Sequence, residues 1–395
     1  MQTTAKLPAS VYLLFFAQTI NLTMAVLSVS VGALAGLKLA PSAALGTVPY
    51  GLQFLAVMLF TYLASFLMRK KGRAFVFHLA SVFLLVSGLL GYQALQLQRF
   101  EVMCLSHFFL GLYIACANFY RFAATDGLEP AIQPKAISLV VLGGVLAAFV
   151  GPFLATRLSS PIAEYVEFSR CYAAMAGFSV FNSALVYCWS RLARTTDMRA
   201  RSGESLSAVS YPKLPILSAV ITGSFGYLVM NLLMILSSIL MQGICSFSDS
   251  SQAIRWHVLS MFLPSFFTGA LINRLGIWCV IHTGFLLLFL ACLMGALLDS
   301  TYDRVVLELI VLGVGWNLSY VGGSALLASN APPRIQHTLQ GVNDSAVALC
   351  ATVGAFLPSV VFSHMGWALT HWLSAGVCAS VLLLNVLINK KIKGM

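Results

Sequence analysis

The sequence predicts an all-α membrane protein with twelve transmembrane helices arranged as two six-helix repeats. Of its 395 residues, 59% are hydrophobic and only 9% are charged, whereas about 25% of the residues in a soluble domain are charged. The apolar residues gather in runs of about 20 or more, the length that a helix needs to cross a bilayer. A short motif also recurs at equivalent places in the two halves of the chain.

Twelve apolar runs are long enough to span the membrane. The first is too long for the core of a signal peptide, so we expect a retained helix. The predicted spans cover residues 9–36, 43–67, 73–95, 101–121, 136–157, 170–193, 214–240, 253–272, 277–298, 304–328, 341–364 and 367–389.

The longest polar stretch, residues 191–215, lies between the sixth and seventh predicted spans. It divides the spans into two sets of six. We therefore predict an N-terminal six-helix bundle over residues 1–193, a cytoplasmic linker over 194–213 and a C-terminal six-helix bundle over 214–395.

The distribution of positive charge predicts the orientation. An even number of spans places both termini on one side of the membrane, and 17 of the 23 Lys and Arg residues fall on that side. Because cytoplasmic loops carry an excess of Lys and Arg, both termini should be cytoplasmic. The net charge of +11 is then an orientation signal that also attracts anionic lipid, and it requires no nucleic acid partner.

Two pairs of short segments indicate an internal repeat. "SFLMRKKG" (65–72) follows the second span and "GALINRLG" (269–276) follows the eighth, which is the second span of the other half. "VGPF" (150–153) in span five similarly matches "VGAF" (353–356) in span eleven. Two parallel six-helix repeats are a known transporter architecture.

With these features the chain resembles the major facilitator superfamily, which has a turn of the form G-x-L-x-D-R-x-G-R after helices two and eight. In the first copy Arg69 stands at the family's Asp position, while Gly72 and Arg73 fit. In the second copy Asn273 replaces the Asp. The second copy keeps the residues Gly269, Leu271, Arg274 and Gly276.

Further segments carry the same resemblance. The R-x-x-x-G pattern of the family's fourth helix reads "HFFLG" here, with His107 in place of Arg, and Gly151-Pro152 matches the Gly-Pro element of the fifth helix. "FYRFAATD" (119–126) and "WHVLSMFLPSFFTG" (256–269) resemble one bacterial branch of these permeases, which includes riboflavin uptake proteins. The resemblance implies a secondary transporter that works by alternating access in a bacterial inner membrane.

The resemblance also implies that helices one, four, seven and ten line a central cavity. All four predicted spans carry polar or aromatic residues near their middles, which suit a neutral or weakly charged organic solute with a flat portion. Hydrogen bonding between helices is the alternative role for each amide. The candidate cavity residues are Gln18, Asn21, His107, Tyr113, Asn118, Tyr227, Asn231, Trp316, Asn317 and Tyr320.

Charged residues at the cytoplasmic ends are candidates for a gate. In the resembled fold the turn after helix two abuts helix eleven, so Asp344 is a candidate partner of Arg69 or Arg73. Arg121 and Asp126 are five residues apart and could pair, or could lie in a solvated loop. The cations of both turns, Arg274 included, have the alternative role of orientation signal.

Two groups are candidates for carrying a coupled proton. Glu308 lies within the tenth span, and a carboxyl group within the membrane is a functional candidate by default. Its alternative role is an interfacial ion pair with Arg304, one helical turn earlier. His107 could titrate near neutrality or serve in packing.

The sequence contains no P-loop, H-E-x-x-H or G-x-S-x-G motif, so it predicts neither an enzyme nor a cofactor or metal site. We expect a monomer that transports a small organic solute with protons, in contact with membrane lipid. Uptake of a riboflavin-like vitamin or an iron chelate is the leading expectation. A drug or metabolite efflux antiporter and a transporter-like membrane sensor are the alternatives.

Overall fold

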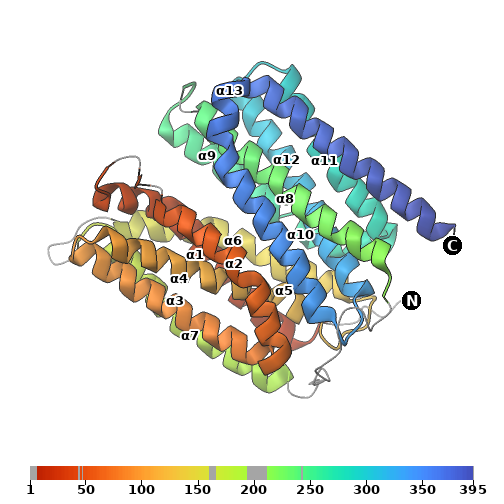
Figure 1. Cartoon of the computed structure of the whole chain (residues 1–395), viewed down its shortest axis with the longest axis horizontal. Coiled ribbons are helices and arrows are strands. Elements are labelled where there is room, and N and C mark those ends of the chain that lie inside the picture. The colour runs from red at the N-terminus through yellow and green to blue at the C-terminus, as the bar shows by residue number, and fades with distance from the viewer. Residues whose placement is uncertain are drawn as a thin grey trace. The chain divides into compact units, whose positions relative to one another are not determined.

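The structure is a computed structural model that describes residues 7–42, 45–46, 48–159, 166–193, 211–241 and 243–394. Within these residues all regular secondary structure is α-helical (Figure 1). The helices are α1 (Ala9–Leu39), α2 (Val48–Lys71), α3 (Arg73–Gln96), α4 (Phe100–Ala117), α5 (Tyr120–Ala123), α6 (Gln133–Ser159), α7 (Ser169–Ala193), α8 (Lys213–Met241), α9 (Phe247–Phe262), α10 (Ser265–Leu275), α11 (Ile277–Leu297), α12 (Tyr302–Asn330) and α13 (Gln336–Lys393).

Among the described residues, eleven helical segments are long and apolar enough to cross a membrane. They coincide with eleven of the predicted spans. The remaining predicted span, 341–364, forms the first arm of α13, whose two arms meet at a kink where Gly366 has φ 72°. The predicted eighth span is built from two helices, α9 and α10, which meet at Leu263 and Pro264.

The repeated turn has the same backbone conformation in both halves. Gly72 between α2 and α3 has φ 84° and ψ 159°, and Gly276 between α10 and α11 has φ 87° and ψ 153°. Residues other than glycine rarely adopt this positive φ. The final glycine of each copy therefore permits a one-residue link between consecutive helices, which explains why the motif interrupts the apolar sequence.

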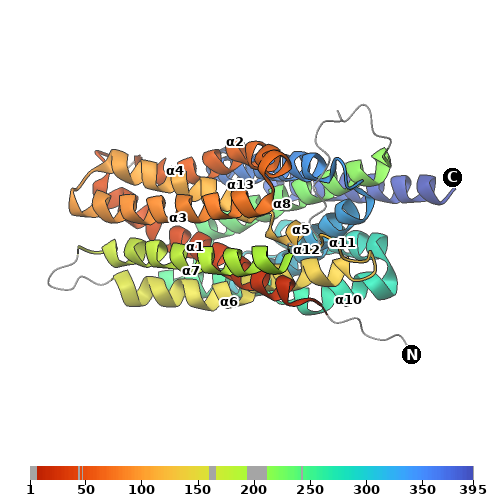
Figure 2. The ribbon, with the colours of Figure 1, turned by 90° about the horizontal axis from the view of Figure 1, so that it is seen from below.

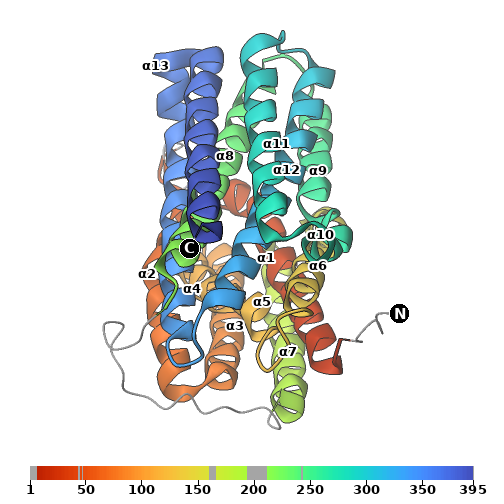
Figure 3. The same cartoon turned by 90° about the vertical axis from the view of Figure 1, so that its right-hand side faces the viewer.

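The chain forms two compact units. The first consists of Met1–Asp126 and Leu146–Gly203, and the second of Gly127–Val145 and Glu204–Met395. In the first unit α3 packs between α4 and α7 (Figure 2). In the second, α12 packs against α8, α9 and α11 (Figure 3). Most of the linker predicted over 194–213 lies outside the described residues.

The first part of α6 belongs to the second unit, and two glycines explain its packing there. A Cβ added to Gly144 would lie 2.2 Å from the Phe262 ring of α9, and one added to Gly269 would lie 2.8 Å from the Lys135 backbone. Small residues let membrane helices approach this closely. The Ser138 hydroxyl also donates to the Ser265 carbonyl of α10. The first glycine of "GALINRLG" thus serves helix packing, whereas the last serves the turn.

Candidate functional site

Aromatic side chains cluster in the second unit. The rings of Trp316 and Tyr320 on α12 are stacked, with centroids 4.7 Å apart and planes 14° apart. Tyr227 of α8 meets Trp316 edge to face at 5.6 Å, and Phe262 of α9 meets it from another direction at 5.8 Å. Tyr227 and Tyr320 are half-buried. Three of the predicted cavity residues, Tyr227, Trp316 and Tyr320, thus lie in contact.

The indole of Trp316 is a candidate hydrogen-bond donor. Its ring is 3% exposed, and its Nε1 has no hydrogen-bond partner among the described residues. A buried tryptophan N–H normally finds a partner. This unused donor beside two half-buried tyrosines makes the aromatic cluster, defined as Tyr227, Phe262, Trp316 and Tyr320, the best candidate for binding a flat solute.

Asn317, in contrast, has the interhelical role that was its alternative. Its Nδ2 donates to the Met261 carbonyl and to Ser265 Oγ, both at 2.6 Å, and its Oδ1 accepts from Thr268 Oγ1 at 2.8 Å. The side chain is fully buried and holds α12 against the junction of α9 and α10. That junction contains Pro264, which has no backbone N–H to donate. A side-chain amide therefore supplies the hydrogen bond that the Met261 carbonyl accepts.

Asn231 also bonds between helices: its Nδ2 donates to the Ala351 carbonyl of α13 at 2.8 Å. In the first unit Asn21 Nδ2 donates to Gln18 Oε1 at 3.3 Å on the same helix, α1. Asn21 Oδ1 is buried and has no hydrogen-bond partner among the described residues. Asn21 thus keeps a buried acceptor that no described residue uses.

His107 lies in a buried network that joins four helices. Its Nε2 lies 2.9 Å from the Tyr172 hydroxyl of α7, and its Nδ1 lies 3.4 Å from Gln53 Oε1 of α2. Ser28 of α1 donates to the same Gln53 oxygen. A Cβ on Gly32 would lie 2.5 Å from the imidazole. This geometry corresponds to the packing role for His107.

The remaining candidates of the fourth span differ in burial. Tyr113 is fully buried, and its hydroxyl has no hydrogen-bond partner among the residues described. Asn118 is half-buried, and its carbonyl accepts from Arg121 at 2.6 Å. The guanidinium of Arg121 also lies 4.3 Å from the Phe122 ring centroid.

The clearest ion pair at the predicted cytoplasmic ends joins Arg73 and Asp126. Arg73 Nε lies 2.6 Å from Asp126 Oδ2, and its Nη2 lies 3.1 Å from Oδ1. Arg73 is therefore the bidentate partner of Asp126, a role for which Arg121 was one candidate in the sequence. Burial raises the pKa of Asp126, while the charge and hydrogen bonds of Arg73 act in the opposite direction.

The other gate candidates differ in their surroundings. Arg69 lies 5.3 Å from the Phe66 ring, and Arg274 is exposed at the end of α10. Asn273, at the family's Asp position, donates to the Ala131 carbonyl at 2.8 Å. Asp344 is buried in the second unit and accepts from Asn343 at 2.8 Å. Its pairing with Arg69 or with Arg73 stays a prediction.

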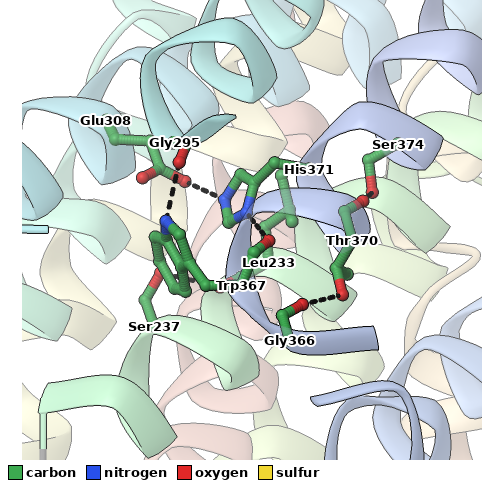
Figure 4. A network of polar contacts seen from close by, with 9 residues as sticks. All are labelled: Leu233, Ser237, Gly295, Glu308, Gly366, Trp367, Thr370, His371 and Ser374. Atoms are coloured by element: carbon green, nitrogen blue, oxygen red, sulfur yellow. Dashed lines mark hydrogen bonds and ion pairs between the residues drawn. The ribbon is translucent and has the colours of Figure 1, made fainter. Parts of the chain in front are cut away.

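Glu308 has a partner that the sequence analysis missed. Its Oε1 lies 2.9 Å from Nε2 of His371 on the second arm of α13, and the two side chains are 2% and 0% exposed (Figure 4). Arg304, the alternative partner, instead binds Asp299 at 2.8 Å on the surface. The expected pairing of Glu308 with Arg304 is therefore wrong. The presence of His371 within the apolar span 367–389 was the signal in the sequence that could have identified this partner.

Comparisons with known proteins agree with this architecture. Residues 9–355 match the profile of the Major Facilitator Superfamily. The chain is 30% identical over 388 residues to the riboflavin transporter RfnT of Brucella anthropi, covering 98% of this chain and 96% of that protein.

Two solved structures share the fold. The human organic anion transporter MFSD10 has a TM-score of 0.75 at 15% identity, covering 96% of this chain and 100% of that one. The proton:xylose symporter XylE has a TM-score of 0.75 at 12% identity, covering 95% and 94%. These likenesses concern the fold alone, and they confirm the prediction of twelve transmembrane helices in two six-helix repeats.

Proposed function

The chain belongs to the major facilitator superfamily, and on that premise we propose that it is a proton-coupled permease for the uptake of a riboflavin-like vitamin. The family consists of transporters and not of enzymes, so the chain is a multi-pass membrane protein that moves a small molecule. The observation that carries the choice of substrate is the aromatic cluster on α8, α9 and α12.

The aromatic cluster matches the chemistry of a flavin. Riboflavin presents a flat, conjugated three-ring system with carbonyl groups at one end. Aromatic rings stabilise such a system by stacking, with about 0.5–1.5 kcal/mol for each pair beyond the burial of area. The half-buried Tyr227 and Tyr320 supply ring faces and edges, and the unused Nε1 of Trp316 supplies a donor for a carbonyl oxygen. The similarity to a riboflavin transporter supports the same substrate.

The proposed cycle follows from the two repeats. The two six-helix bundles would rock about a site near the middle of the membrane and expose it to each side in turn. Both termini would be cytoplasmic, as the excess of Lys and Arg on their side indicates. A monomer contains both bundles and is sufficient for this cycle.

Flavin fluorescence tests the substrate directly. We expect riboflavin fluorescence to be quenched by the purified protein with a saturable dependence on protein concentration. Trp316→Ala should weaken this binding about tenfold, because the loss of one ring contact of about 1.4 kcal/mol is a tenfold change in affinity. Trp256→Phe is the matched control, since Trp256 is 48% exposed on α9, and it should bind as the unchanged protein does.

Two results would contradict the proposal. Absence of riboflavin binding by a folded protein would exclude the substrate. Equal affinity in Trp316→Ala and in the unchanged protein would place the flavin elsewhere.

A further inference from the structure

We propose that Glu308 and His371 form a proton-binding site that couples transport to the proton gradient, and that it lies apart from the aromatic cluster. This inference rests on the proposed transport function and assigns its coupling to two residues. One of them, His371, is on the last transmembrane segment of the chain. The hydrogen bonds of the His371 imidazole ring determine where a proton can bind.

The first nitrogen of His371 has a fixed role. Nδ1 lies 2.9 Å from the Trp367 carbonyl oxygen, and a carbonyl oxygen can only accept a hydrogen bond. Nδ1 must therefore carry a proton and donate it. The tautomer is assigned from this partner, as it is for any histidine whose hydrogens are placed by their hydrogen bonds.

The second nitrogen then requires a shared proton. With Nδ1 protonated, Nε2 of a neutral imidazole is an acceptor, and it faces Glu308 Oε1 at 2.9 Å. A lone pair facing a carboxylate oxygen at this distance would be repulsive. A proton must lie between the two atoms, either on the carboxyl group of Glu308 or on an imidazolium of His371. The pair as observed is thus the proton-loaded state.

Loss of this proton should open the contact between two helices. The deprotonated pair would leave a buried carboxylate without a donor from His371, which is costly inside a membrane. Glu308 belongs to α12 and His371 to the second arm of α13, so separation of the pair moves one helix relative to the other. Binding and release of a proton are in this way linked to helix position.

The site is built and enclosed by two further helices, α11 and α8. Trp367 Nε1 donates to the Gly295 carbonyl of α11 at 2.7 Å, and the Trp367 and His371 rings lie 4.2 Å apart (Figure 4). A Cβ on Gly295 would lie 2.2 Å from the His371 ring. From α8 come Leu233 and Ser237, whose hydroxyl donates to the Leu233 carbonyl.

The other titratable groups near Glu308 and His371 are thiols, a histidine bonded to a backbone carbonyl, and charged residues at the surface. On α11 and α13 the thiols of Cys292 and Cys378, both fully buried, are the titratable neighbours of Glu308. His257 of α9 is bonded through Nδ1 to the Leu309 carbonyl at 2.7 Å. On α12 itself Arg304 is bound to Asp299, and Asp303 is exposed.

The position along the helices suits exchange with one side of the membrane. Glu308 follows the start of α12 by six residues and His371 follows the kink at Gly366 by five. At 1.5 Å per residue the pair lies about 8 Å from those helix ends. Trp316 lies eight residues farther along α12, about 12 Å from the proton site. One helix therefore carries both sites, and its movement can couple them.

Glu308→Gln provides the main test. The glutamine amide can donate to His371 Nε2 and imitates the proton-loaded pair. In proteoliposomes we expect riboflavin exchange at equal concentrations to persist, while accumulation driven by an imposed pH gradient is lost and the pH dependence of the riboflavin KM becomes flat. Accumulation by Glu308→Gln with the unchanged pH profile would overturn the inference. Absence of riboflavin binding by the unchanged protein would instead defeat the proposed function.

Two further measurements separate proton binding from a structural role. Gly295→Ala should displace the His371 ring and reduce driven accumulation more than exchange, whereas Gly376→Ala, where a Cβ meets nothing within 4 Å, should change neither. Infrared difference spectra between acid and alkaline pH should contain a carboxyl band that disappears in Glu308→Gln. An identical spectrum in the variant would show that Glu308 does not titrate and would overturn the inference.

Discussion

Substitution of Asn317 by alanine separates the two roles that the sequence allowed for this residue. Asn317→Ala removes three hydrogen bonds, at 2.6, 2.6 and 2.8 Å, between α12 and the junction of α9 and α10. Interhelical hydrogen bonds in membrane proteins contribute about 0.6 kcal/mol each on average and at most about 1.7 kcal/mol. The three together predict a loss of about 2 kcal/mol in the free energy of unfolding, with a ceiling of about 5 kcal/mol.

The assay combines unfolding and binding on the same preparations. The free energy of unfolding would be measured by titrating the purified protein from mild detergent into a denaturing one, and riboflavin affinity by flavin fluorescence. Asn330→Ala is the control, because within the described part of the chain Asn330 Nδ2 bonds to the Leu326 carbonyl and to Ser329 Oγ of its own helix. Unchanged stability of Asn317→Ala together with lost riboflavin binding would refute the packing role.

Two more predictions concern the turns and the ion pair. Gly276→Ala should lower the free energy of unfolding by about 1–2 kcal/mol, because a residue with a Cβ is strained at φ 87°. Gly177→Ala, in open helical surroundings, should be neutral or slightly stabilising in the same denaturation assay. A double-mutant cycle of Arg73→Ala and Asp126→Asn should give a coupling energy of about 1–2 kcal/mol, since the pair is bidentate but the Asp126 side chain is 33% exposed. Additive effects of the two changes would contradict the ion pair, and equal losses in the two glycine variants would contradict the role of φ.

The positions of the spans could be predicted from the sequence because apolar length alone determines whether a helix crosses a bilayer. The predicted span 277–298, for example, is α11 over Ile277–Leu297. The repeated turn was equally readable, since its final glycines occupy the same unusual backbone conformation. The break inside the eighth span was signalled only by Pro264, which membrane helices often tolerate.

Side-chain partners were the part that the sequence did not reveal. Glu308 and His371 are 63 residues apart and Arg73 and Asp126 are 53 apart. No local spacing rule connects such distant positions, whereas the rules for neighbouring turns suggested Arg304 and Arg121. The same limit applies to Asn317, because its residue type fits a cavity and a helix contact equally well. The burial and the three bonds of its amide distinguish these roles only in the folded chain.

The most direct test of the proposed function is riboflavin accumulation in proteoliposomes under an imposed pH gradient. One coupled proton supports about a tenfold concentration ratio per pH unit, because one unit corresponds to about 1.36 kcal/mol. We predict that riboflavin accumulates inside when the interior is alkaline, and that a proton ionophore abolishes the accumulation. Riboflavin that equilibrates across the membrane but shows the same final ratio with and without the gradient would contradict proton-coupled uptake.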